Sequence, residues 1–446
     1  MAKEKESLQQ QLSKRKMKLP NKIINFFYHF IFRTFVMPKY RPHIKVIDKV
    51  SDCKGACFLI WNHLSRLDHG YLMSAAYPRP LSIVAGYNEF FRSHLHTVFK
   101  LMRIVPKKNF AYDPGGIKAM NSIIRQGGCL AFSPEGTSSI TGINQPVVAG
   151  TGHFIRHFKI PVYYMELRGQ YLTCTKVCLD ERYGRTEGEL RLLFTPEDLE
   201  RMTDDEVENK INELFKHDDY EWGKQNHIRW KNNGQMARQL NDMLYKCPKC
   251  GAEFTLSCEG NVIRCEKCGN GASINDYYEF VPLDDTCVLP ESPSVWVQNQ
   301  RQDIIREIRA DNNYSFTEHV KMGYLPEDHL VKNKQLGEMC GEGDITFDHD
   351  GIHYRGTKLG KPFDFDLTYT AIFQPSIVTD LTNFCLYVNL EFYVFYPEHH
   401  TTGKILLITE EMHRLHVNTW KNFPWFDYMY ENVPEYIPAA KEEEDQ

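Results

Sequence analysis

The sequence predicts an α/β domain that is followed by a small cysteine-rich module and a β-rich C-terminal module. Three observations support this fold class. Apolar runs typical of buried strands alternate with helical stretches from residue 45 to residue 165, two Cys-x2-Cys-Gly pairs follow at 247–251 and 265–269, and short alternating runs with turn residues begin after Cys340. Strands that alternate with helices predict one sheet covered by helices, with the functional loops at the strand ends.

Size and composition set the outer limits for the fold. A chain of 446 residues exceeds what one hydrophobic core normally organises, so we expect two or three domains. Charged residues make up 25% and the mean hydropathy is -0.47, which argues against several membrane-spanning helices. Of the 13 cysteines, four form two close pairs and the others are scattered, as is typical of a reduced, intracellular protein.

Charge is distributed unevenly along the chain. Residues 1–49 contain twelve Lys or Arg and three acidic residues, whereas residues 437–446 form an acidic tail. We interpret residues 1–20 as a flexible basic arm, which favours an anionic surface as a partner. A membrane surface fits better than nucleic acid because the next segment is apolar, so nucleic-acid binding is disfavoured.

Residues 21–40 predict an amphipathic helix that lies in a membrane interface. The apolar stretch from Asn21 to Met37 covers seventeen residues, whereas a helix needs about 20 to cross a bilayer. Its polar residues share one helical face: Lys22, Asn25, His29 and Arg33. The alternative is a helix that packs its aromatic side chains on the domain core. The first interpretation predicts a cytoplasmic protein attached peripherally to the inner face of a membrane.

Residues 41–240 predict the α/β domain. We expect strands at 45–47, 56–61, 81–85, 129–132 and 160–165, and helices at 90–102, 117–125, 203–215 and 235–244. The helix from residue 203 begins with the capping box Thr203-Asp204-Asp205-Glu206.

Two motifs directly follow two of these predicted strands. The first is Asn62-His63-Leu64-Ser65-Arg66-Leu67-Asp68, and the second is Phe132-Ser133-Pro134-Glu135-Gly136-Thr137. An aspartate placed after a histidine in this way can orient the imidazole ring and leave its far nitrogen free as a base. A Gly turn after a strand exposes backbone N–H groups that can receive a phosphate or a developing oxyanion. No nucleophile elbow surrounds Ser65, so this is an acid/base site without its own nucleophile.

These two motifs, in this order and at this distance, resemble the signatures of the glycerophospholipid acyltransferase family, of the 1-acylglycerol-3-phosphate acyltransferase type. The resemblance covers residues 45–169. It implies a mixed sheet flanked by helices over residues 41–240. It also implies transfer of a fatty acyl group from acyl-CoA or acyl carrier protein to the hydroxyl of a lysophospholipid. In that reaction His63 would be the general base oriented by Asp68, and the acceptor would be bound by Asn62, Glu135, Gly136 and Thr137.

The cations expected at an acceptor phosphate depart from the family pattern. The middle family block matches residues 104–108, with Lys107 and Lys108 where an Arg is usual, and Arg103 precedes it. The Arg that often follows the Thr of the second motif is replaced by Ser138. Lysine offers charge but no planar fork for a phosphate. Two alternatives therefore stay open: a lipid acceptor without a phosphate, or a solvated basic rim with no binding role.

Four cysteines form a predicted metal site. Cys247, Cys250, Cys265 and Cys268 make two Cys-x2-Cys-Gly knuckles with fourteen residues between the pairs. Such loops can direct four thiolates at one tetrahedral ion with no open coordination position, so the predicted Zn²⁺ is structural. Residues 241–283 resemble a zinc ribbon, and iron in a rubredoxin-like site is the alternative. A ribbon of this size has little core of its own, so the ion would hold it together.

Residues 284–436 predict the β-rich C-terminal module. We expect a hairpin at 345–354 around Asp350-Gly351, strands at 384–395 and 404–408, and a helix at 410–420. We interpret this module as a surface for lipid or protein. A last alternative for the whole chain is a zinc-ribbon scaffold or lipid-binding protein whose acyltransferase domain is inactive.

Overall fold

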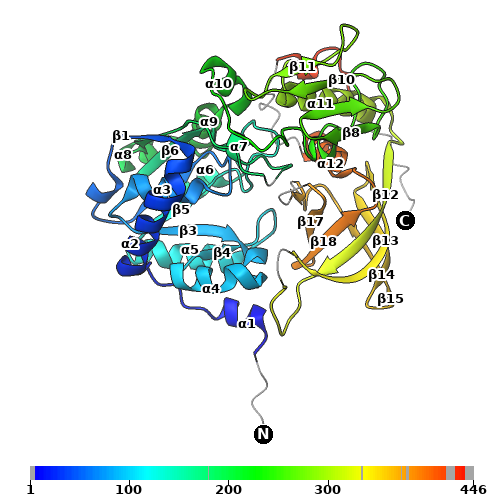
Figure 1. The fold of residues 1–446 in the computed structure, drawn as a ribbon. Helices are drawn as coiled ribbons and strands as arrows, with labels where there is room; N and C mark the ends of the chain where they lie inside the picture. Colours follow the sequence, from blue (N-terminus) through cyan, green and yellow to red (C-terminus); the bar gives the residue numbers. More distant parts are fainter. Residues whose placement is uncertain are drawn as a thin grey trace.

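The computed structural model describes residues 6–178, 180–332, 335–372, 374–377, 381–417 and 427–436. This part of the chain forms three sheets (Figure 1): a seven-stranded sheet, a four-stranded sheet, and a second seven-stranded sheet. The predicted acidic tail at 437–446 and the first five residues of the basic arm lie outside the described residues.

The first sheet is mixed, which confirms the predicted α/β fold. Its strand order is β1-β7-β6-β2-β5-β3-β4. The strands are β1 (Pro42–Val46), β2 (Cys57–Trp61), β3 (Leu81–Gly86), β4 (Val105–Lys107), β5 (Cys129–Phe132), β6 (Val162–Arg168) and β7 (Thr186–Phe194). The five strands β6, β2, β5, β3 and β4 are parallel, whereas β7 runs antiparallel to β6 and parallel to β1.

Helices cover both faces of this sheet. Successive residues of the central strand β2 point to opposite faces, so this strand contributes to two hydrophobic cores. Cys57, Leu59 and Trp61 belong to one hydrophobic core together with α3, and Phe58 and Ile60 belong to a second core with α5, α6 and α9. The helices of this half are α3 (Asp68–Ala76), α4 (Ser93–Met102), α5 (Pro114–Arg125), α6 (Thr151–Phe158), α7 (Gln170–Thr173), α8 (Pro196–Arg201), α9 (Asp204–Phe215) and α10 (Asp219–Gln225), with short 3-10 turns at Val50–Asp52 and Tyr87–Phe91.

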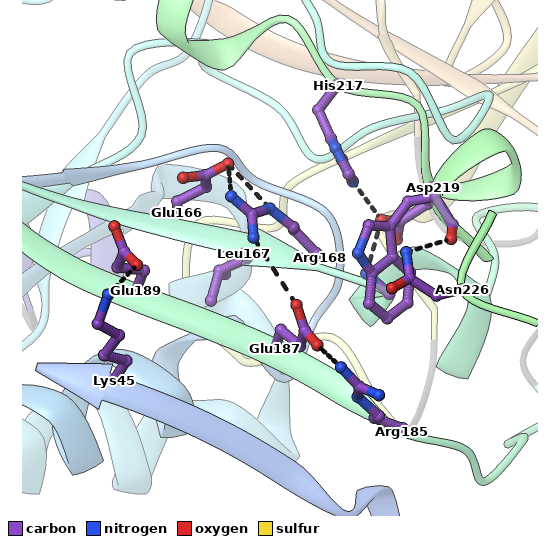
Figure 2. Close-up of polar contacts among 12 residues, drawn as sticks. Lys45, Glu166, Leu167, Arg168, Arg185, Glu187, Glu189, His217, Asp219 and Asn226 are labelled. Atoms are coloured by element: carbon purple, nitrogen blue, oxygen red, sulfur yellow. Dashed lines mark hydrogen bonds and ion pairs between the residues drawn. The ribbon is translucent and has the colours of Figure 1, made fainter. Parts of the chain in front are cut away.

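The outer strands of the first sheet carry a ladder of charged side chains (Figure 2). Lys45 of β1 contacts Glu189 of β7 at 3.2 Å. Arg168 of β6 contacts Glu166 at 2.6 Å and Glu187 at 3.7 Å. Because these pairs are partly exposed, each contributes little to stability on its own.

Beyond β6 the chain is fixed by the buried carboxylate of Asp219 (Figure 2). This carboxylate accepts the backbone N–H groups of Gly169 at 2.6 Å and Tyr171 at 2.7 Å, and it contacts Nε2 of His217 at 2.5 Å. These bonds fix α7 next to α10. They also fix the start of the segment that follows α7, which contains Lys176.

The N-terminal segment contains α1 (Leu8–Ser13) and α2 (Lys22–Ile31), and α2 continues as a π-helical turn (Phe32–Val36) and a 3-10 turn (Met37–Tyr40). Part of the polar stripe of this helix faces the protein: Asn25 is buried, and the His29 ring stacks on Tyr77 with centroids 4.2 Å apart. Six large apolar side chains are exposed instead, and we call them the apolar patch: Ile23, Phe26, Phe27, Phe30, Ile31 and Phe35. The alternative of packing on the core holds for Phe32, which is buried in it, and for Tyr28, which packs against it, but not for the six residues of the apolar patch.

Among the described helices, none combines the length and the apolar character that crossing a bilayer requires.

The four-stranded sheet contains the cysteine pairs. Its antiparallel strands, in the order β11-β10-β9-β8, are β8 (Leu256–Glu259), β9 (Val262–Cys265), β10 (Gly271–Ile274) and β11 (Phe280–Pro282). This small sheet contacts both larger parts of the molecule. Tyr278 donates a hydrogen bond to the carbonyl of Leu172 at 2.9 Å, and Glu253 pairs with Lys404 at 2.6 Å.

The second seven-stranded sheet is antiparallel, in the order β15-β14-β13-β12-β18-β17-β16. Its strands are β12 (Ser315–Tyr324), β13 (Glu338–Asp348), β14 (Ile352–Lys358), β15 (Lys361–Leu367), β16 (Ser376–Ile377), β17 (Phe384–Val388) and β18 (Glu391–Pro397). It is accompanied by α11 (Pro293–Ala310), α12 (Thr402–Val417) and a 3-10 turn (Asp427–Tyr430). The predicted hairpin at 345–354 is confirmed, because Phe347 of β13 pairs with Ile352 of β14.

Three details of the sequence prediction differ from the structure. The run 404–408 is not a strand but part of α12, in which residues 405–408 are almost completely buried. Residues 235–244 contain only the 3-10 turn Leu240–Asp242, preceded by Gln239 in a left-handed conformation with φ 60°. The stretch 384–395 is a hairpin of β17 and β18 rather than one strand, and the last three residues of the predicted helix 410–420 lie outside the described residues.

Candidate active site and cysteine cluster

The structure places the side chains of His63 and Asp68 in contact. Nδ1 of His63 lies 2.8 Å from Oδ2 of Asp68, which begins α3. The same carboxylate accepts the backbone N–H groups of Leu64 at 2.8 Å and Ser65 at 3.0 Å, and its side chain is only 1% exposed. The aspartate is therefore held rigidly, and it fixes the plane of the imidazole. A second histidine, His69, has both ring nitrogens engaged, by the Arg66 carbonyl and the Tyr28 hydroxyl.

The two sequence motifs meet because they follow neighbouring parallel strands. Strand β2 pairs with β5 from Cys57 opposite Cys129 to Ile60 opposite Phe132, so their carboxyl ends lie at one edge of the sheet. The His63 backbone is clamped from both sides by the second loop. Its N–H donates to the Glu135 carboxylate, and its carbonyl accepts the Ser139 N–H at 2.6 Å.

Glu135 and Asn62 lie behind the site rather than in it, since the side chains of both residues are buried and neither lines the adjacent cavity. The Glu135 carboxyl accepts N–H groups of His63 and of Gln145, the latter at 2.8 Å, and burial raises its pKa to about 8. The Asn62 amide exchanges two hydrogen bonds of 2.8 Å with the backbone of Leu167 on β6. Both side chains therefore hold backbone segments together.

A cavity of about 1930 Å³ lies beside His63. Gly136, Thr137 and Ser138 line it, and Gly136 has φ +70°, a conformation that favours glycine. Much of the remaining wall is apolar and comes from the first half of the chain: Ile83, Val98, Phe99, Met102, Ile117 and Phe132. The opposite wall comes from the second half: Leu336, Ile377, Asn383, Cys385, Tyr387 and Tyr396. The cavity is thus formed by both large parts of the molecule.

Of the three predicted cations, one lines this cavity. Lys107 does so, and burial lowers its pKa. Lys108 instead donates to the Leu390 carbonyl at 2.6 Å, in the turn between β17 and β18. Arg103, at the end of α4, donates to the carbonyl of Leu19 and does not line the cavity. Arg103 and Lys108 therefore do not line the cavity, although they lie in or next to the middle family block in the sequence.

Lys176 is a cavity residue that sequence reasoning missed. It is 9% exposed, and its Nζ donates to Oγ of Ser138 at 2.8 Å. Burial lowers its pKa to about 8. No motif surrounds it, and it reaches the site only through the turn fixed by Asp219, so the sequence held no signal for it.

The four predicted cysteine ligands form one cluster. Their sulfur atoms all lie within 4.8 Å of one another. Sγ of Cys247 is 3.7 Å from Sγ of Cys268, and Sγ of Cys250 is 3.8 Å from Sγ of Cys265. A tetrahedral Zn²⁺ with Zn–S bonds of about 2.3 Å requires sulfur–sulfur distances of about 3.8 Å, whereas a disulfide requires about 2.05 Å. The cluster could hold a metal ion and is consistent with zinc.

The chain was compared with protein-family models, curated proteins and solved structures. A search of curated proteins finds no match. Among solved structures, the 1-acyl-sn-glycerophosphate acyltransferase PlsC from Thermotoga maritima is similar at 13% sequence identity and a TM-score of 0.33, over 47% of this chain and 96% of that chain. The family model described as Acyltransferase matches residues 39–166, which contain both motifs of the site. Residues 39–166 are therefore similar to the Acyltransferase family.

Proposed function

We propose that this protein is an O-acyltransferase of phospholipid biosynthesis, which moves a fatty acyl group from acyl-CoA or acyl carrier protein to the hydroxyl of a lysophospholipid resembling 1-acylglycerol-3-phosphate. The observation that carries the proposal is the contact of 2.8 Å between His63 and Asp68 at the edge of a cavity of about 1930 Å³. A cavity of this size has room for an acyl chain as well as a polar head.

In the proposed reaction, Nε2 of His63 takes the proton of the acceptor hydroxyl while the oxygen attacks the thioester carbonyl. Asp68 stabilises the imidazolium that forms. When the tetrahedral intermediate collapses, the C–S bond breaks, and the leaving thiolate takes the proton back from His63. Ser65 does not carry the acyl group in this mechanism, since it is 3% exposed and its Oγ accepts the Leu67 N–H at 3.0 Å.

The apolar patch on α2 supports attachment to a membrane surface. Tyr28 of α2 lines the cavity, and so does Val98 of α4, which is 43% exposed. The cavity therefore lies close to the patch. Burial of one Phe side chain contributes roughly 1.5–3 kcal/mol, so several Phe residues can hold the protein on lipid, as interfacial helices do. A lipid acceptor could then reach His63 from the membrane.

We propose that the cysteine cluster binds a structural Zn²⁺. Cys247, Cys250, Cys265 and Cys268 would be its ligands, and the ion would supply the cohesion that a small four-stranded sheet lacks. None of these residues lines the cavity beside His63.

The test compares two histidine variants of the purified full-length protein. His63→Ala should lower the rate of thiol release from acyl-CoA about 10² to 10⁴-fold, and the acylated lipid should disappear from mass spectra. His153→Ala is the matched control, because His153 also pairs with an aspartate, Asp204, at 2.9 Å, but its side chain is 73% exposed and does not line the cavity. Full activity of folded His63→Ala protein would refute His63 as the general base, whereas absence of thiol release from the wild-type protein would favour the inactive scaffold.

A lipid without a phosphate is a second candidate acceptor for the same acyl transfer, because of the residue at position 138. The family's usual arginine is absent at this position, which favours a lipid hydroxyl that carries no phosphate. Better turnover of a monoacylglycerol than of a lysophosphatidate with the same chain would establish this alternative.

A further inference from the structure

One strand of the C-terminal sheet presents a polar face to the active-site cavity. Asn383, Cys385 and Tyr387 line the cavity, whereas Phe384, Leu386 and Val388 are buried among the C-terminal hydrophobic side chains. This alternation is what β17 requires, since neighbouring residues of a strand point to opposite faces. The side chains on the cavity face are thus set by the register of the strand.

Two polar groups on this face have no protein partner among the described residues. Asn383 is 4% exposed, and its Oδ1 is buried without a hydrogen bond. The hydroxyl of Tyr387 is also buried without one. Buried polar groups are almost always hydrogen-bonded in folded proteins. These two atoms therefore point to a ligand or water that shares the cavity with them.

Lys176 brings a positive charge to the same place. It interacts electrostatically with Cys385 of β17 and with Glu89, and Tyr387 also interacts with Glu89 and Cys385. Glu89 is already paired with Arg92 at 2.8 Å. The ammonium of Lys176 lies beside Ser138, 2.8 Å from its Oγ, directly after the Gly136–Thr137 turn.

We propose that Lys176, Asn383 and Tyr387 form a head-group chamber that binds the phosphate-bearing end of the acyl acceptor. This inference rests on the proposed acyl transfer and deepens it. The ammonium of Lys176 pairs with the phosphate, the Tyr387 hydroxyl donates to a phosphate oxygen, and Oδ1 of Asn383 accepts from the neighbouring glycerol hydroxyl. The C-terminal module is then part of the substrate site. Lys176 also takes the place of the arginine that is missing at Ser138.

The chamber contains a buried cation, two polar groups without partners, and the loop that follows the second motif. An uncharged lipid head would leave the ammonium of Lys176 without an anionic ligand. A phosphate monoester pairs with this ammonium and accepts from the Tyr387 hydroxyl, and the glycerol hydroxyl donates to Oδ1 of Asn383. The nucleotide part of acyl-CoA also carries phosphates, so the experiment must separate acceptor from donor.

The test uses full-length protein, oleoyl-CoA as donor, and two acceptors that differ in the phosphate alone, 1-oleoylglycerol-3-phosphate and 1-oleoylglycerol. For Lys176→Met, we expect the ratio of kcat/KM for the phosphate acceptor to that for the other to fall about 10- to 100-fold. Lys176→Arg should restore most of the ratio, and Tyr387→Phe should lower it about 3- to 10-fold. Lys321→Met, at an exposed position on β12, is the control.

An unchanged ratio in Lys176→Met and Tyr387→Phe would overturn the inference, and so would a rise in the KM for oleoyl-CoA without a change for the acceptors. If the wild-type protein transfers oleate to neither acceptor, the proposed function fails separately. In that case, the affinity of the protein for 1-oleoylglycerol-3-phosphate, measured by calorimetry, still tests the proposed head-group chamber. Weaker binding to Tyr387→Phe and Lys176→Met than to wild type supports it, and equal binding overturns it.

Discussion

The substitution Asp68→Asn isolates the charge of the carboxylate, because it changes one atom and preserves the shape of the side chain. Oδ2 of Asp68 accepts three hydrogen bonds, at 2.8 Å from Nδ1 of His63, at 2.8 Å from the Leu64 N–H and at 3.1 Å from the Ser65 N–H. An asparagine oxygen in the place of Oδ2 retains all three bonds. The imidazole ring keeps its orientation, but the negative charge beside it is lost.

The imidazolium that forms when Nε2 of His63 takes the proton of the acceptor hydroxyl then has no carboxylate to stabilise it. We therefore expect kcat to fall about 10² to 10⁴-fold. The KM should change little, since the Asp68 side chain is only 1% exposed. Replacing one charge-assisted hydrogen bond by a neutral one should cost about 1–2 kcal/mol of folding free energy, which leaves the protein folded.

The assay is thiol release from acyl-CoA at saturating acceptor, with urea unfolding as the measure of stability. Asp204→Asn is the matched control: its partner His153 lies on the surface, and Arg156 pairs with the same carboxylate at 3.0 Å. If Asp68→Asn keeps more than about a tenth of wild-type kcat while His63→Ala is inactive, the proposed stabilisation of the His63 imidazolium by Asp68 is wrong.

Three further predictions concern the metal, the membrane and the buried glutamate. Cys265→Ser should abolish binding of one Zn²⁺ per chain, measured by mass spectrometry of metals, and should expose residues 241–283 to protease; a full complement of zinc would contradict this. Phe30→Glu should weaken binding to anionic liposomes roughly 10- to 100-fold, whereas Leu359→Glu, at a residue 63% exposed outside the apolar patch, should not. Burial raises the pKa of Glu135 from 4.5 to about 8. That contribution to stability is complete below pH 4.5 and is lost as the pH rises through 8. The stability of wild type relative to Glu135→Gln should therefore fall over this range in urea unfolding, and a constant difference would refute the assignment.

His63 and Asp68 could be predicted as a candidate site because the proposed chemistry limits which residues can form it. A base and its orienting carboxylate must be close in space, and a spacing of five residues across the start of a helix achieves this locally, so His63 and Asp68 could be identified together. Glu135 is different. It belongs to a motif, but the structure uses it to hold the His63 backbone, and a motif alone does not separate a group that faces a substrate from one that supports it.

The cavity wall could not be predicted because it depends on contacts between distant parts of the chain. Lys176 and Tyr387 are separated by more than 200 residues, and neither belongs to a recognisable motif. The wrong strand at 404–408 has a related cause. Its unbroken apolar run fits a buried strand or a buried helix equally well, and only the packing of α12 against α11 and the second sheet decides between them.

The position of the cysteine-rich module connects the proposed metal site to the candidate active site. Tyr278, in the turn between β10 and β11, donates to the carbonyl of Leu172 in α7, four residues before Lys176, and Glu253 pairs with Lys404 of α12. The module therefore contacts both the segment that carries Lys176 and a helix that packs beside the C-terminal sheet. Because a structural Zn²⁺ supplies most of the cohesion of such a small sheet, its removal should disturb the spacing between Lys176 and β17. Loss of zinc should then lower the preference for a phosphate-bearing acceptor more than it lowers the basal rate at His63, although no cysteine ligand touches the cavity.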